Sequence, residues 1–423
     1  MQRLLILFLS FSILVLGTFA QAEILTWDSC VKEVATGNGE LSAARFSEEA
    51  AKDRSKATYG SFLPQVFLNG GVSRDRSGSA ATPSSLTSET TSYSGSLEIR
   101  QNLFSGFLDS GSVREARAEH SSASADLRLR KAKVSYDLKS AFVGLKYSQD
   151  AVELADQILK RREENTKLVE LRFEGGRENK GSVMLAKAAF AQSQYEALQA
   201  QQNLDIAAQE LARVLGREQV QGLSVSGAVP LKEPPLAVPF EKLAVDNPEY
   251  QKASSNLAAS EAQRLKTRSA FFPSVDAVAN FGRLDERWFP QNERFSVGLN
   301  VSFPLFNGGR NFYETSAASK SLRAAFVSQT ETARSLLVSL KQAHSRFSLS
   351  VQKLKVDSDF KNAAQVRAEI ARKRYNNGLL SFEDWDAIEN DLIQREKTLL
   401  QSERDRVIAE ANWEQVQGKG AID

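Results

Sequence analysis

A short polar and acidic run follows Gly378, and its residue types suit only a few kinds of chemistry. Ser381 and Asp384 have a spacing similar to that of a helix capping box, and carboxylates are favourable in the first turn of a helix. Glu383 and Asp386 lie in the same run. The run therefore suits the start of a helix, and its three carboxylates within four residues could also attract cations.

Enzyme chemistry has little support elsewhere in the chain. Cys30, His120 and His344 are too few for a zinc site with the usual ligands, and one cysteine cannot form an internal disulfide. The sequence contains no glycine-rich phosphate loop and no nucleophile elbow. Its 54 Lys and Arg nearly balance 52 Asp and Glu, which argues against nucleic acid as a partner. We therefore expect no catalytic residue, metal, cofactor or enzymatic activity.

Residues 1–22 have the features of a secretory signal peptide. Arg3 precedes a mostly apolar run at 4–16, which is too short to span a bilayer as a helix, and the Ala-Gln-Ala sequence at 20–22 fits a cleavage site. An uncleaved anchor is the less favoured alternative. Cys30 lies well beyond the expected cut, whereas a lipid-modified cysteine would follow it directly. We expect an exported protein that is not a lipoprotein.

Two long tracts without proline must supply the elements that position the acidic run. No proline falls between residues 84 and 229 or after 304, and proline inside a helix costs about 3 kcal/mol or more. Mostly apolar residues alternate steps of four and three in the first tract, as in a coiled-coil seam: Val134, Leu138, Ala141, Leu145, Ser148, Val152, Ala155 and Leu159. Arg162 and Thr166 interrupt this seam. A helix over about 112–172 would be roughly 90 Å long, which suits a rod or tube.

The chain is an internal duplication. At an offset of 202, matched pairs continue for over a hundred residues, including Leu138 with Leu340, Arg172 with Arg374, and Gly176 with Gly378. Such a constant register predicts two copies of one unit. The first repeat is expected at 23–229, with a β-hairpin at about 63–104 and long helices at about 108–216. A proline-rich linker at 230–240 precedes the second repeat at 241–423, with a hairpin at about 272–306 and long helices at about 310–418.

Alternation of polar and apolar residues predicts the strands of each hairpin. It is complete over 295–303 and clear over 93–100, and the expected partner strands are about 66–73 and 275–282. This is about the length of a strand that crosses a membrane, although a soluble sheet with one wet face shows the same pattern. A membrane barrel needs about eight strands or more, whereas one chain offers four. The membrane interpretation therefore requires several chains, of which three would supply twelve strands.

This layout resembles the TolC family of outer-membrane efflux proteins over essentially all of residues 23–423. The resemblance lies in the order and spacing of motifs present in both repeats: the strand entries Leu63-Pro64 and Phe272-Pro273, the strand exits at 103–106 and 305–310, and the glycine corners at 172–176 and 374–378. It implies a mainly α fold with a membrane β-barrel part. Three chains would form a twelve-stranded outer-membrane barrel that continues as a long α-helical coiled-coil tunnel in the periplasm.

The resemblance also implies a function. The homotrimer would be a passive exit duct in the outer membrane of a Gram-negative bacterium, surrounded there by lipid, for small molecules such as drugs and toxic compounds or for proteins. Its expected partners are a periplasmic adaptor (membrane fusion) protein and an inner-membrane pump of the RND, ABC or MFS type. The alternative is a periplasmic coiled-coil adaptor or scaffold without its own pore, although an adaptor would show one helical hairpin between halves of a small β-domain.

The resemblance further assigns roles at the two corners, where the tunnel of this family narrows at its periplasmic tip. Asp384 matches an aspartate that rings the constriction and Tyr375 matches a gating tyrosine, with Glu383 or Asp386 replacing a second acid whose position is Ala387 here. The expected adaptor-docking residues are Arg172, Gly176, Ser182, Arg374, Gly378 and Ser381. A basic gate residue falls on Leu380 and a first-repeat acid on Ser182, so the gate bonds of other members are not expected to carry over.

Overall fold

The computed structural model describes residues 23–77, 88–218 and 222–422. The segment interpreted as a signal peptide lies outside the described residues. The described chain forms two compact units, and each unit draws on both sequence repeats. The first, named the helical unit, contains residues 23–38, 137–231 and 352–408. The second, named the strand unit, contains residues 39–136, 232–351 and 409–422.

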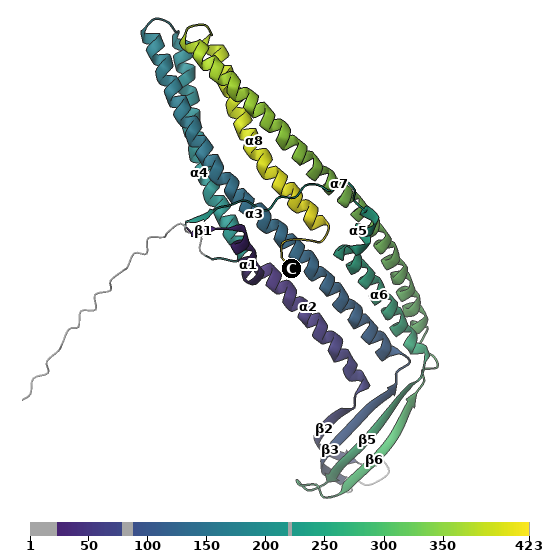
Figure 1. Ribbon diagram of the computed structural model, residues 1–423. Helices are drawn as coiled ribbons and strands as arrows, with labels where there is room; N and C mark the ends of the chain where they lie inside the picture. Colours follow the sequence, from purple (N-terminus) through teal and green to yellow (C-terminus); the bar gives the residue numbers. More distant parts are fainter. Residues whose placement is uncertain (1–22, 78–87, 219–221, 423) are drawn as a thin grey trace, which may run out of the picture. The chain divides into compact units, whose positions relative to one another are not determined.

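The strand unit contains a four-stranded antiparallel sheet in the order β2-β3-β5-β6 (Figure 1). Its members are β2 (Gln65–Ser77), β3 (Ser88–Phe104), β5 (Ser274–Asp285) and β6 (Glu293–Ser302). Each predicted hairpin is therefore present, and the two hairpins pair with each other through β3 and β5. Strands β2 and β6 are the edges of this sheet, so within residues 23–77, 88–218 and 222–422 each has one side without a strand partner.

The register gathers the apolar side chains of all four strands on one face of the sheet. Successive residues of a strand point to opposite faces, so residues opposite each other in the register share a face. One apolar row consists of Val66, Ile99, Ala279 and Val297. The next row on that face consists of Leu68, Leu97, Phe281 and Phe295. Most of these large side chains are exposed, so the part of the chain that the structure describes leaves the apolar face largely uncovered.

Helices extend from the strands within the same unit. They are α2 (Gly39–Ala57), α6 (Pro248–Arg268), and the first parts of α3 (Leu108–Glu174) and α7 (Arg310–Asn376), with the short α5 (Phe240–Asp246) before α6. The 3-10 turns η1 (Thr58–Phe62) and η2 (Ser269–Phe271) join α2 to β2 and α6 to β5.

Ion pairs tie the helices of the strand unit together. Lys252 of α6 donates to Asp126 of α3 at 2.5 Å, and this hydrogen bond holds the pKa of the Asp126 carboxyl below its usual range. Glu40 of α2 accepts from Lys133 and Arg130 of α3 at 3.0 and 2.9 Å, and the bond from Lys133 is the main cause of its lowered pKa. These carboxylates stay ionised at neutral pH and fasten α2 and α6 to α3.

The helical unit contains α1 (Trp27–Gly37), α4 (Lys180–Leu215), most of α8 (Phe382–Val416), and the second parts of α3 and α7. The seam predicted in the first tract is real, because Leu138 and Leu145, which both lie in this unit, are fully buried in α3. A two-stranded parallel sheet of β1 (Glu23–Leu25) and β4 (Leu223–Val225) completes the unit. Its strands are too short for any periodic pattern to predict them. Within the described ranges, no helix is both long and apolar enough to span a membrane.

Candidate functional site

Both long helices end at a glycine corner with the same backbone geometry. Gly176 and Gly378 have φ angles of 67° and 75°, a region that glycine reaches without steric cost. After α7, the N–H of Leu379 donates to the carbonyl of Arg374 and the N–H of Gly378 donates to that of Tyr375, both at 2.9 Å. This pair of bonds is a Schellman motif, and equivalent bonds close the corner after α3. The reversal predicted at each glycine is therefore present.

The acidic run forms the helix cap that its spacing predicts. The hydroxyl of Ser381 donates to the Asp384 carboxylate at 2.8 Å, and the N–H of Asp384 donates back to the Ser381 hydroxyl at 3.1 Å. Asp384 and its neighbour Glu383 are nevertheless exposed in the single chain. Because the cap uses a neutral hydroxyl, it leaves the negative charge of Asp384 uncompensated. A capping role and a charged role are therefore compatible at this residue.

Tyr375 lies in the core that joins the two corners, which are neighbours at one end of the helical unit (Figure 1). Its side chain is fully buried, and its ring stacks on Trp385 with centroids 4.3 Å apart. The Arg172 guanidinium lies 4.4 Å above the same ring and donates to the Tyr375 carbonyl at 2.6 Å. The Tyr375 hydroxyl donates to the Glu178 carboxylate at 2.9 Å. Helices α3 and α4 form one helical hairpin, and α7 and α8 form the other. One tyrosine therefore contacts three partners that come from both helical hairpins.

The hydroxyl of Tyr375 remains a hydrogen-bond donor at any physiological pH. Burial raises its pKa far above the ordinary value for tyrosine, and the bond to Glu178 raises it further. Glu178 lies between α3 and α4 and is not a residue that the sequence analysis singles out, because the family's first-repeat acidic position falls on Ser182, which is not an acid. The acidic partner of the tyrosine lies four residues before that position.

A second contact joins the hairpins away from the corners. Arg162 of α3 donates to Asp386 of α8 at 2.8 Å, and Arg162 also donates to Asn390. The Arg162 and Asp386 side chains are only 9% and 16% exposed. Removing one partner from a pair this far withdrawn from water costs roughly 3–5 kcal/mol. Asp386 is therefore an ion-pair residue whose charge is already compensated, unlike that of Asp384.

The residues expected at a docking tip divide into two groups. Arg374, Gly176, Gly378 and Ser381 are exposed around the corners. Arg172 is partly covered because it packs on the Tyr375 ring. Ser182 is buried, and its N–H donates to the Asn179 side chain that caps α4. The structure therefore packs Arg172 on Tyr375, pairs Asp386 separately with Arg162, and leaves Asp384 and the glycines at the surface.

The two hairpins contribute different chemistry although they are repeats. At the offset of 202, Tyr375 corresponds to Phe173, Trp385 to Val183 and Asp386 to Met184. The second repeat thus supplies the buried aromatic rings and the paired carboxylate, and the first repeat supplies the arginines that contact them. The contact between the hairpins is complementary, so neither repeat could replace the other.

Comparison with known proteins agrees with this architecture. The sequence profile of the family described as outer membrane efflux protein matches residues 31–217 and 240–419. AprF of Pseudomonas aeruginosa, an alkaline protease secretion protein, is 23% identical over 321 residues, which are 73% of this chain and 64% of AprF. TtgC of Pseudomonas putida, a probable efflux pump outer membrane protein, is 24% identical over 407 residues, which are 90% of this chain and 81% of TtgC.

Solved structures show the same fold. The outer-membrane channel OprN matches with a TM-score of 0.84 at 20% identity, over 93% of this chain and 90% of that one. The CmeC outer membrane channel of Campylobacter jejuni matches with a TM-score of 0.84 at 14% identity, over 94% and 86%. The predicted fold class, mainly helical and built from a duplicated repeat, is confirmed, as is the outer-membrane location in a Gram-negative bacterium. The chain belongs to the outer membrane efflux protein family, the TolC-like channels.

Proposed function

We propose that three copies of this chain form a passive exit duct across the outer membrane. The observation that carries the proposal is the four-stranded sheet, which has an exposed apolar face and two unpaired edges, β2 and β6. Unpaired strand edges cannot persist in lipid, and four strands are too few to close a barrel. Pairing β6 of one chain with β2 of the next would close three sheets into twelve strands.

The contacts between the two helical hairpins would hold the tip of the duct closed. Tyr375 with Glu178 and Arg162 with Asp386 both link one hairpin to the other. Opening requires the hairpins to separate, so these bonds set part of the free energy of opening. Around the pore, Asp384 and Glu383 from three chains would form a ring of carboxylates, since both are exposed at the start of α8. Such a ring attracts cations.

The exposed corner residues would meet a periplasmic adaptor. Arg374, Gly176, Gly378 and Ser381 are accessible there, whereas Ser182 is buried and is left out of the proposed surface. The inner-membrane pump would be of the RND, ABC or MFS type. The relatives support two classes of cargo, because TtgC is named for an efflux pump and AprF for protease secretion. A scaffold without a pore is disfavoured, since it would have no need of the apolar sheet.

The mass of the purified protein tests the proposal. Extracted from membranes in mild detergent, the mature chain should run as a particle of three copies by light scattering corrected for bound detergent. Circular dichroism should show an intact β contribution in the same sample. A monodisperse monomer with that β contribution would contradict the duct, because one sheet would then be stable in a membrane environment without closure.

A further inference from the structure

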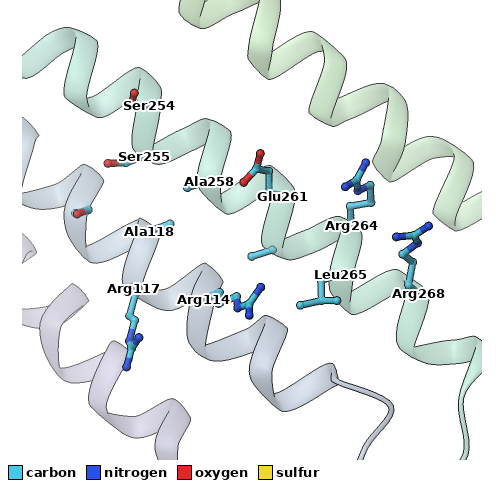
Figure 2. Close-up of a pocket in the computed structure, with 12 residues that line it drawn as sticks. Arg114, Arg117, Ala118, Ser254, Ser255, Ala258, Glu261, Arg264, Leu265 and Arg268 are labelled. Carbon is cyan, nitrogen blue, oxygen red and sulfur yellow. The ribbon is translucent and has the colours of Figure 1, made fainter. Parts of the chain in front are cut away.

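A groove lined by four arginines lies between α3 and α6 in the strand unit (Figure 2). Arg114 and Arg117 come from α3, and Arg264 and Arg268 come from α6. The groove has a volume of 690 Å³, and among the described residues that line it Glu261 is the one with a carboxylate. Figure 2 shows Arg114 between the two helices, whereas Arg117 points away from α6 and Arg264 and Arg268 point away from α3, so four positive charges border the groove with a single negative charge.

The chain does not neutralise these arginines. Within the described residues, Arg114, Arg264 and Arg268 have no carboxylate partner. Arg117 donates to the Tyr59 hydroxyl and lies 5.4 Å over that ring, which leaves its charge uncompensated. Lysines of the same helix behave differently, as Lys266 pairs with Glu115 at 2.5 Å. The strand-proximal ends of α3 and α6 therefore present guanidinium groups around the groove whose charge the described residues leave uncompensated.

The groove lies close to the ends of the membrane strands. Arg114 is six residues after the start of α3 at Leu108, which corresponds to about 9 Å of helix. Arg268 is the last residue of α6, directly before η2. Large apolar side chains are exposed around these strand ends: Phe62, Leu63, Phe271, Phe272, Phe303, Leu305 and Phe306. Such a girdle marks the membrane interface of a barrel, so the arginines lie at the level of the lipid headgroups.

We propose that this groove binds the phosphate group of an anionic lipid in the periplasmic leaflet of the outer membrane. The guanidinium fork matches two phosphate oxygens at once, which makes arginine well suited to phosphate recognition. A free phosphate ion has the same headgroup chemistry, but it has no acyl chain to contact the exposed apolar girdle beside the groove. The bound lipid would fix the depth of the chain in the membrane, a role separate from export.

A second groove supplies a matched control. Arg54 of α2 lines it together with Glu119 and Asp126, which lie on a different face of α3 from Arg114. Before the first strand of each repeat, matched residues are 209 positions apart, as Pro64 and Pro273 are. At this offset Arg54 corresponds to Gln263, one position from Arg264, so it lies at the same level along its helix. Its side chain is exposed and has no carboxylate partner within the described residues. Replacing it removes the same charge from a groove that holds acidic side chains.

Native mass spectrometry of the full-length protein with added phosphatidylglycerol or cardiolipin tests the proposal. Each arginine near an anionic lipid surface is worth about fivefold in affinity, so Arg114→Gln/Arg268→Gln should weaken lipid binding roughly thirtyfold. Arg54→Gln should bind lipid as the wild type does. Equal binding by the double variant and the wild type, or an equal loss in Arg54→Gln, would overturn the proposal.

Calorimetric titration with inorganic phosphate, in the absence of anionic lipid, separates the two sources of phosphate. A lipid site should show no saturable binding of the free ion. Saturable binding that disappears in the double variant would make the groove a soluble-anion site and overturn the lipid assignment. Circular dichroism and heat-modifiable migration should confirm that each variant is assembled. If the double variant does not assemble, the exposed Arg268→Gln alone should still show about a fivefold loss.

Discussion

Replacing Tyr375 by phenylalanine removes one hydroxyl from the contact between the two hairpins and little else. The ring remains stacked on Trp385 and under Arg172, because neither contact involves the hydroxyl. The bond that is lost joins the hydroxyl to the Glu178 carboxylate at 2.9 Å. If this bond helps to hold the tip closed, Tyr375→Phe should shift the channel toward its open state while the tip remains folded.

The size of the shift follows from the surroundings of the two groups. A hydrogen bond to a charged group contributes about 1.5–3 kcal/mol, and the value is smaller where water can replace the donor. Glu178 is only half-buried and can be rehydrated, so we expect the lower end, about 1.5 kcal/mol, or roughly a tenfold change in the opening equilibrium for each chain. The raised pKa of Tyr375 keeps the hydroxyl protonated, so the bond should persist from neutral pH to about pH 10 and be lost as the pH rises through that raised value.

Single-channel recording in planar bilayers measures this equilibrium directly. Tyr375→Phe should increase the fraction of time spent in the high-conductance state by at least about tenfold, or to saturation, because each of the three chains loses one bond. Glu178→Gln, which keeps an acceptor oxygen but removes its charge, should give a smaller increase. Tyr313→Phe is the matched control, because Tyr313 is an exposed tyrosine on the same helix. Open fractions that are equal in the wild type, Tyr375→Phe and Glu178→Gln would refute a closing role for the Tyr375–Glu178 bond.

Three further predictions follow. Asp384→Asn keeps a cap acceptor but removes the charge, so it should reduce cation selectivity and block by divalent cations in bilayers. Ser381→Ala should leave both properties unchanged but destabilise the first turn of α8 by about 1 kcal/mol. An unaltered reversal potential in Asp384→Asn would exclude the carboxylate ring. Leu299→Arg places a charge on the apolar face at a cost of roughly 2–4 kcal/mol, so it should reduce barrel assembly, measured by heat-modifiable migration, far more than Asn300→Arg on the other face. The hydrogen bond from Lys252 lowers the pKa of Asp126, so the stabilising effect of this pair is present above about pH 4 and is lost as the pH falls below it. The melting temperature should be constant from pH 7 to 5 and lower at pH 3. A melting temperature at pH 3 equal to that at pH 7 would count against this ion pair.

The helices and strands were predictable because their patterns are periodic and long. Absence of proline and the seam around Leu138 predicted α3, and complete alternation near Leu299 predicted β6. Gly176 and Gly378 could be assigned to helix ends because only glycine takes a positive φ at so little cost. Each of these signals lies within a few residues of the element that it predicts.

The partners inside the tip were not predictable in the same way. Tyr375 and Glu178 are 197 positions apart, and Arg162 and Asp386 are 224 apart, so no local spacing relates them. The sequence does mark Arg162 as unusual, since it interrupts the coiled-coil seam at a position where an apolar residue is expected. Ser182 was expected at the exposed docking surface, but it is buried. A serine near a helix reversal gives no local sign in the sequence that packing will bury it.

Closure of the barrel between chains is the central claim, and one crosslinking measurement tests it directly. Val66→Cys in β2 and Val301→Cys in β6, introduced into the same chain, place exposed thiols near the same end of the two edge strands. Cys30, the chain's own cysteine, is buried. Treatment of intact membranes with a short thiol crosslinker should yield a covalent trimer as the largest product. Monomer alone, or a ladder that continues beyond three copies, would contradict a barrel closed by three chains.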